Sequence, residues 1–186
     1  MYPQPMATKR ASPKPRWLND AEHNAWMELL RVFVSVPAAL DGQMRRDSGL
    51  GSYEYRVLGV LAEQASRTMG LKQLALVTDG SLSRLSHALT RLEKAGYVRR
   101  QVNSDDGRLT EAVLTAAGHK KVVAAAPGHV AMVRELIFDG LTEDQVAQLT
   151  SLLSLVARDM THPVVEYHER TYTHTGAYRE PGSSAT

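Results

Sequence analysis

The stretch from residue 82 to residue 100 reads LSRLSHALTRLEKAGYVRR and decides the fold. Its leucines recur at helical spacing, which predicts a helix from Ser81 to Ala95 with an apolar stripe of Leu82, Leu85, Leu89 and Leu92. Gly96 follows at a position where helices commonly end in the left-handed region. The outward side carries hydroxyls, an imidazole and cations but no acid: Ser83, Arg84, His87, Thr90, Arg91 and Lys94. Such a face suits a polyanion, although exposed basic helix faces also occur on proteins that bind none.

Two further helical patterns precede this helix, and a β-prone pattern follows it. We expect one helix to start at a Ser52 cap, and a short one to run from Leu71 to Val77. The β-prone runs at residues 97–102 and 112–114 flank turn residues, so we predict a hairpin. Helix, short helix, helix and hairpin in this order predict a helix-turn-helix followed by a wing. The wing favours DNA as the partner of the basic face.

The tip of the predicted hairpin carries an arginine, Arg108, behind Asp106 and Gly107. We expect the Arg108 guanidinium to enter a narrow minor groove and Asp106 to orient a neighbouring cation. Phosphates would be contacted by one of Lys94, Arg99 and Arg100. For Asp105 and Gly107 the alternative is that only the geometry of the turn requires them.

Helical patterns also flank the predicted helix-turn-helix and wing. The first covers residues 26–40, and Pro37 should end or kink this helix. After the wing, Thr115 is the expected cap of a long helix in which Pro127 predicts a kink or a break. A capping-box spacing that begins at Thr142 opens the last predicted helix.

Three motifs together resemble the MarR family of winged helix-turn-helix transcriptional regulators: the string at residues 82–100, DDGR at 105–108 and LTAAG at 114–118. The resemblance extends from Trp26 to about Asp159. It implies an obligate homodimer, joined by the first helix and the last two, whose wings spread over double-stranded DNA. It also implies that DNA is contacted from the recognition helix and the wing, by Ser83, Arg84, Ser86, His87, Arg91, Asp106 and Arg108.

The fold class that follows is mainly α with a small β-hairpin wing, a winged helix-turn-helix lobe plus a helical dimerisation region. We expect five segments along the chain: a disordered basic arm at 1–20, a dimerisation helix at 21–50, the winged helix-turn-helix DNA-binding domain at 51–115, dimerisation helices at 116–160 and a C-terminal extension at 161–186.

Composition excludes several classes of protein. Of the 186 residues, 43% are hydrophobic and 23% are charged, which is typical of a globular chain. The absence of cysteine excludes disulfides, thiolate metal sites and the peroxide-sensing branch of the family. The spacing of the seven histidines presents no pair of ligands on one helical face, so we expect neither a metal nor a cofactor.

Two further absences in the sequence bear on location and activity. No apolar run reaches the roughly 20 residues of a membrane helix, so we predict a soluble, cytoplasmic protein that makes no membrane contact. Motifs such as GxSxG, HExxH and GxGxxG are missing, so we predict that the chain is not an enzyme.

Four aromatic residues are candidates for the lining of an effector pocket: Trp26, Phe33, Tyr53 and Tyr55. The alternative is that they belong to the core. The resemblance implies that such a pocket takes a small aromatic or anionic effector whose binding weakens DNA binding. We predict a homodimeric repressor that acts on a pseudo-palindromic operator with half-sites roughly 34 Å apart. The alternative function is a winged-helix protein-interaction module without specific DNA binding.

Overall fold

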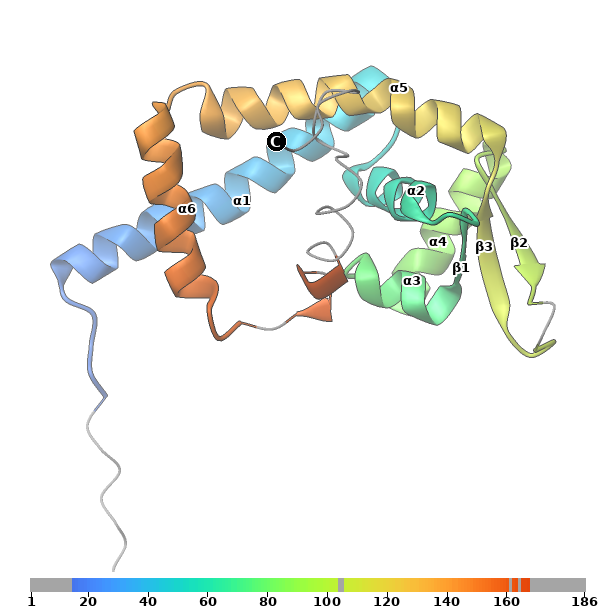
Figure 1. The fold of residues 1–186 in the computed structure, drawn as a ribbon, viewed down its shortest axis with the longest axis horizontal. Helices are drawn as coiled ribbons and strands as arrows, with labels where there is room; N and C mark the ends of the chain where they lie inside the picture. The colour runs from blue at the N-terminus through green and yellow to red at the C-terminus, as the bar shows by residue number, and fades with distance from the viewer. Residues whose placement is uncertain (1–14, 104–105, 161, 164, 168–186) are drawn as a thin grey trace, which may run out of the picture. The chain divides into compact units, whose positions relative to one another are not determined.

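The computed structural model describes residues 15–103, 106–160, 162–163 and 165–167 (Figure 1). It is mainly helical with a small antiparallel sheet, as the sequence predicted. The arm expected at 1–20 and the extension expected at 161–186 lie largely outside the described residues. In chain order the elements are α1 (Asp20–Ser48), α2 (Ser52–Glu63), β1 (Thr68–Gly70), α3 (Leu71–Val77), α4 (Leu82–Lys94), β2 (Val98–Val102), β3 (Thr110–Leu114), α5 (Ala116–Val133), the π-helical turn η1 (Arg134–Phe138) and α6 (Glu143–Ala157).

The chain divides between Ser35 and Val36 into two compact units. In the first unit, Asn19 starts α1 with a reciprocal cap that sequence reasoning missed. Its Oδ1 accepts from Glu22 N at 2.9 Å, and Glu22 Oε2 accepts from Asn19 N at 2.9 Å. Large apolar side chains of this unit are exposed, namely Trp26, Met27, Val32, Phe33 and Val34. Apolar patches of this kind on a single chain usually mark a surface that a partner covers.

We expected Pro37 to end or kink α1. The helix continues through Pro37, so the expected end is wrong, and the kink stays a prediction. Proline removes one N–H and therefore one bond to the carbonyl four residues earlier, at Phe33. Phe33 lies on the exposed part of the helix. Pro127 likewise lies inside α5, which does not break there, and the irregular turn begins only at Arg134.

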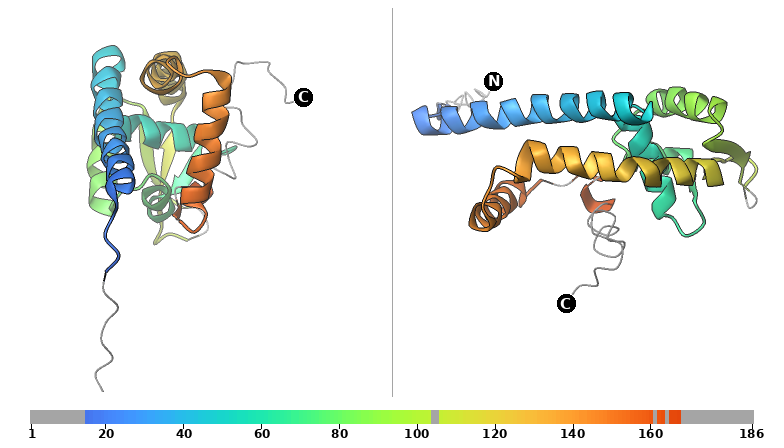
Figure 2. Two further views of the ribbon diagram at one scale, coloured as in Figure 1. Left: turned by 90° about the vertical axis from the view of Figure 1, so that its left-hand side faces the viewer. Right: turned by 90° about the horizontal axis from the view of Figure 1, so that it is seen from above.

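In the second unit, α2, α3, α4 and the sheet enclose the core. Leu58, Leu61, Leu74, Leu85 and Leu89 are each at most 1% exposed. The strand order is β1-β3-β2, and both pairings are antiparallel. Strand β1 was not predicted, because three residues are too few to show an alternating pattern. Helix α5 starts beside this sheet and leads towards α6 (Figure 2).

Helix caps account for most of the boundaries in the second unit. The predicted cap of α5 is confirmed, because Thr115 Oγ1 accepts from Gly118 N. Ser81, which we expected inside the helix, is instead the N-cap of α4, and its Oγ accepts from Arg84 N. The predicted capping box of Thr142 with Gln145 is also present. The cap of α2 was placed one residue too late, because Gly51 is the N-cap and Ser52 is already helical.

Replacing Gly118 with alanine is expected to destabilise the fold by about 1–3 kcal/mol. A Cβ at Gly118 would overlap the Tyr97 carbonyl and the Leu114 side chain where α5 leaves the sheet. Thermal unfolding measures the effect. Gly59→Ala is the matched control, since nothing lies within 4 Å of a Cβ there. Equal melting temperatures for Gly118→Ala and the wild type would contradict the packing of this corner.

Candidate nucleic-acid interface

Helix α4 separates a buried apolar side from an exposed basic side. Leu85, Leu89 and Leu92 are buried as predicted, but Leu82 is 53% exposed, so its assignment to the buried stripe is wrong. Ala88 is fully buried and moves the centre of the stripe away from Leu82, at 100° per residue. All the predicted outward residues, with Ser86, are exposed: Ser83, Arg84, His87, Thr90, Arg91 and Lys94.

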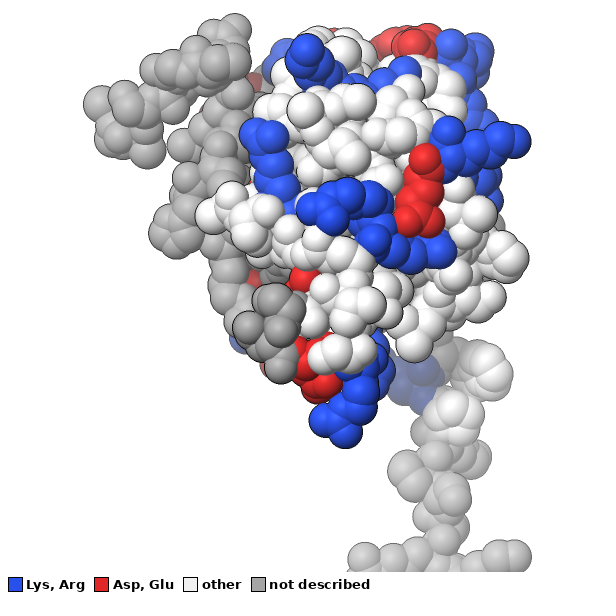
Figure 3. All heavy atoms as spheres, turned by 90° about the vertical axis from the view of Figure 1, so that its right-hand side faces the viewer, with Lys and Arg blue, Asp and Glu red and all other residues white. Residues whose placement is uncertain are grey.

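Basic side chains also extend over the side of the molecule on which β2 and β3 lie. Figure 3 shows Lys and Arg side chains spread over this face and fewer acidic side chains among them. Salt-dependent attraction to a phosphate backbone requires this kind of surface.

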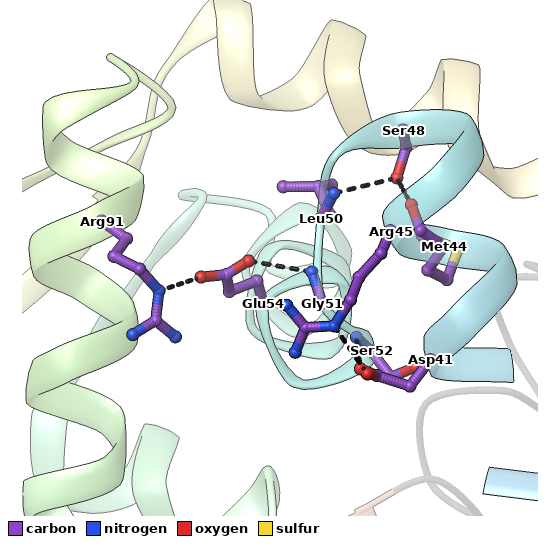
Figure 4. A network of polar contacts seen from close by, with 9 residues as sticks. All are labelled: Asp41, Met44, Arg45, Ser48, Leu50, Gly51, Ser52, Glu54 and Arg91. Carbon is purple, nitrogen blue, oxygen red and sulfur yellow. Dashed lines mark hydrogen bonds and ion pairs between the residues drawn. The ribbon is translucent and has the colours of Figure 1, made fainter. Parts of the chain in front are cut away.

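Two arginines of α4 contact side chains of α2. The Arg84 Cζ atom lies 4.1 Å from the centroid of the Tyr53 ring. Arg91 Nε donates to Glu54 Oε1, and the other carboxylate oxygen of Glu54 accepts from Gly51 N at 2.9 Å (Figure 4). Sequence reasoning missed Glu54 as a partner of the basic face, because 37 residues separate it from Arg91.

The corner between α1 and α2 belongs to the same polar network (Figure 4). Asp41 Oδ2 accepts from Arg45 Nε at 2.7 Å, and Asp41 Oδ1 accepts from Ser52 N at 2.8 Å. The hydrogen bond from Arg45, followed by the hydrogen bond from Ser52 N, holds the pKa of Asp41 below its usual value. Asp41 therefore remains ionised and caps the start of α2.

The wing presents Arg108 to solvent, as the sequence predicted. Its side chain is 92% exposed, and Asp106 Oδ1 accepts from both Arg108 N at 3.0 Å and Arg108 Nε at 3.2 Å. Asp106 thus orients the arginine through its backbone and its guanidinium. Asn103 Oδ1 accepts from Asp106 N at 2.8 Å and fixes this side of the turn. The predicted turn residue Asp105 lies outside the described residues.

Arg108→Ala is expected to weaken DNA binding and to make it less dependent on salt. An exposed guanidinium that neutralises one phosphate, or occupies an electronegative groove, releases about one counterion. Fluorescence anisotropy of a labelled duplex at several salt concentrations measures both changes. Binding that matches the wild type at every salt concentration would remove the wing from the interface.

Arg100, a predicted DNA contact, fastens β2 to α4. Its Nη2 donates to Ser86 O at 2.9 Å and to Thr90 Oγ1 at 3.1 Å. Its Nη1 lies 3.3 Å from Glu93 Oε2, and its backbone N donates to Glu93 Oε1 at 2.8 Å. The Arg100 side chain is only 30% exposed. The described contacts therefore give Arg100 a structural role, and its contact with DNA stays a prediction.

The four candidate effector residues occupy different settings. Trp26 and Phe33 are exposed in the first unit, Tyr53 lies under Arg84, and Tyr55 contacts the His129 ring with centroids 5.0 Å apart. A small cavity of about 120 Å³ is lined by Gln43, Met44, Asp47, Ser48, Lys121, Ala124, Ala125 and Gly128, and by none of the four. The effector assignment therefore stays a prediction.

His129 should make stability depend on pH. Burial lowers the pKa of its imidazole below the usual value of 6.5, because the charged form loses hydration. The folded state then favours the neutral ring, so stability is complete above about pH 6.5 and falls as the pH drops through the lowered pKa. His129→Gln is expected to lose less stability than the wild type between pH 7.5 and pH 5 in thermal unfolding. Parallel curves would contradict this role.

Two further absences hold for the part of the chain that the structure describes. No group of three or more His, Cys, Asp or Glu side chains is placed to hold a metal ion. None of the helices in the described ranges is both long and apolar enough to cross a bilayer.

Comparisons with known proteins identify relatives with this architecture. No family model matches the chain. Sco3205 from Streptomyces coelicolor, a MarR family transcriptional regulator solved in complex with DNA, is 37% identical over 81% of this chain and 94% of its own, with a TM-score of 0.72. AbsC, a MarR family regulator from the same organism, is 36% identical over 77% and 97%, with a TM-score of 0.69. An uncharacterised HTH-type transcriptional regulator from Bacillus cereus is 28% identical over 132 residues, or 70% of this chain and 85% of that protein.

Proposed function

The chain belongs to the MarR family of DNA-binding transcriptional regulators, and on that premise we propose that it is a homodimeric repressor of a pseudo-palindromic operator. The observation that carries the proposal is the exposed, acid-free side of α4 beside the arginine of the wing. An α-helix fits the major groove, and an arginine can pair bidentately with guanine there. A dimer bound across a promoter would exclude the polymerase, and its site of action would be the cytoplasm, where the DNA lies.

Exposed apolar side chains support the dimer. On α6, Leu152, Leu153, Leu155 and Val156 are each at least 46% exposed, and α6 contains no buried residue. In the first unit, Trp26 and Phe33 are also exposed. A two-fold dimer would bury such patches against their copies and place two recognition helices about 34 Å apart, one turn of B-DNA.

We also propose regulation by a small aromatic or anionic effector. The cavity of about 120 Å³ between α1 and α5 is too small for such a molecule, because ligand pockets usually measure about 300–1,000 Å³. A second cavity, of about 200 Å³, is also below this range. We infer that the effector site forms in the dimer, and the effector must prefer the form that does not bind DNA. Benzoate is a suitable first probe, and a dose-dependent release of the duplex is the expected result. Unchanged DNA binding would remove aromatic carboxylates from the proposal.

A gel shift with the DNA upstream of the protein's own coding sequence tests the proposed function. We expect a complex that survives an excess of random duplex and weakens as salt rises. With Arg84→Ala, an excess of random duplex should displace the upstream DNA from the protein. The absence of any complex would favour the other candidate, a winged-helix module that binds protein.

A further inference from the structure

We propose that Tyr53 and Glu54, neighbours in the first turn of α2, are positioning residues that hold Arg84 and Arg91 ready to read bases. The inference rests on the proposed function and goes beyond it, because neither α2 residue needs to touch DNA. According to this inference, the ability to distinguish DNA sequences depends in part on α2, which packs against the recognition helix α4.

Arg84 lies on an aromatic platform. Its guanidinium carbon is 4.1 Å from the centre of the Tyr53 ring, which is the geometry of a cation–π contact. A guanidinium that stacks by its face keeps the N–H groups at its edge available. Because bidentate pairing with guanine uses that edge, the Tyr53 ring can restrain Arg84 without occupying its donors.

Thr78 and Gly80 restrain the Tyr53 side chain. Thr78 is fully buried, and its hydroxyl donates to Leu74 O at 2.6 Å. A hydroxyl has one proton, so in the 3.1 Å contact between the two side chains Tyr53 OH donates to Thr78 Oγ1. Gly80 leaves room for the ring, since a Cβ there would overlap the Tyr53 hydroxyl. The hydrogen bond and the close approach at Gly80 therefore restrain the Tyr53 ring.

Glu54 restrains Arg91 in a different way. The residue is 8% exposed, and its carboxylate accepts from both Gly51 N and Arg91 Nε (Figure 4). A buried carboxylate needs such partners. Within the part of the chain that the structure describes, Arg91 uses only Nε of its guanidinium, and its side chain is 64% exposed. Both terminal nitrogens of Arg91 therefore remain for a base or a phosphate.

The two restraints act together. Arg84 and Arg91 are seven residues apart, which places them on one side of α4 two turns from each other. Tyr53 and Glu54 are adjacent in α2. One turn of this helix therefore restrains the guanidinium groups of both arginines. An arginine that is ordered before binding loses less side-chain entropy when it binds DNA. Affinity rises only for a base pair that matches the ordered position of the arginine, so the restraint increases discrimination between bases.

The test measures base-by-base discrimination. Wild-type protein first selects duplexes from a randomised pool, and anisotropy then gives affinities for the selected duplex and for each single-base change. We expect Glu54→Gln to lower discrimination about 2- to 10-fold at the base pair that Arg91→Ala affects. Tyr53→Leu should do the same at the base pair that Arg84→Ala affects. Affinity for random duplex should change little.

Double variants separate positioning from general stability. If Glu54 acts through Arg91, Glu54→Gln should cost nothing further in the Arg91→Ala background, and Tyr53→Leu should cost nothing further in the Arg84→Ala background. Glutamine keeps an oxygen for Gly51 N, so the cap of α2 survives. Tyr55→Leu and Asp41→Asn are matched controls, because they change the same helix and its capping corner without contacting either arginine.

The outcomes are distinguishable. If the losses of discrimination in a double variant equal the sum of those in the single variants, the inference is overturned while the proposed function stands. The same holds if Glu54→Gln or Tyr53→Leu lowers affinity equally for all single-base changes. A wild-type protein that enriches no sequence contradicts the proposed function and the inference together.

Discussion

Replacing Leu152 and Val156 with glutamate is expected to produce a folded monomer that binds its operator about 10²- to 10⁴-fold more weakly than the wild type. These side chains are 61% and 55% exposed and lie four residues apart, on one side of α6. In the proposed dimer they would be buried against a second copy, where an unpaired carboxylate is strongly unfavourable. Two linked recognition helices bind far more tightly than one, so loss of the dimer removes most of the affinity.

Light scattering gives the mass, which should equal the 20.5 kDa of one chain for the variant and twice that for the wild type. Ala147→Glu with Ser151→Glu is the matched control, because it adds two charges at the same spacing five residues earlier on α6. Circular dichroism confirms that each variant folds. A double variant that stays dimeric, or a monomer with wild-type affinity, would contradict the role of this surface.

Replacing Arg84 or Arg91 with alanine is expected to lower affinity for the selected operator by about 1–3 kcal/mol each, or about 5- to 150-fold. Both side chains lie on the exposed side of α4 and keep terminal N–H groups free of the contacts with α2. Removal of a base contact should affect the operator more than a random duplex. Lys120→Ala, which removes an exposed cation from α5, is the control and should change neither affinity.

Anisotropy titrations with the operator and with a scrambled duplex at the same salt concentration measure both losses. Equal losses on the two duplexes would show that the arginine contacts only phosphate. Arg84→Lys is a useful second variant, because lysine keeps the charge but cannot form the planar bidentate pair. It should retain binding to the scrambled duplex and lose discrimination.

The sequence predicted those parts of the fold that depend on neighbouring residues. The helical spacing of the leucines of α4, the left-handed Gly96 and the Thr115 and Thr142 caps are all local signals. The structure confirms each of them, except that Leu82 is exposed. Where the structure differs from the prediction, either the local effect was weak or the deciding contact joins residues far apart in the sequence. Pro37 costs α1 a single hydrogen bond, and the three residues of β1 find their place only by pairing with β3.

The candidate site was predicted by residue type but not by contact. Helical spacing placed Arg84 and Arg91 on the outward side of α4, and the turn residues placed Arg108 at the tip of the hairpin. The structure has all three exposed. Sequence spacing could not show that Tyr53 supports Arg84, because that contact joins two helices and depends on the space beside Gly80. Local patterns determine what a helix presents, whereas tertiary packing determines how firmly each side chain is held.

Selection of duplexes from a fully randomised pool by the wild-type protein tests the central claim most directly. If the outward side of α4 and the wing read DNA as a two-fold pair, the enriched sequences should form a pseudo-palindrome with half-site centres about 10 base pairs apart. A pool that stays random after selection, or enriches a motif without two-fold symmetry, would contradict the account.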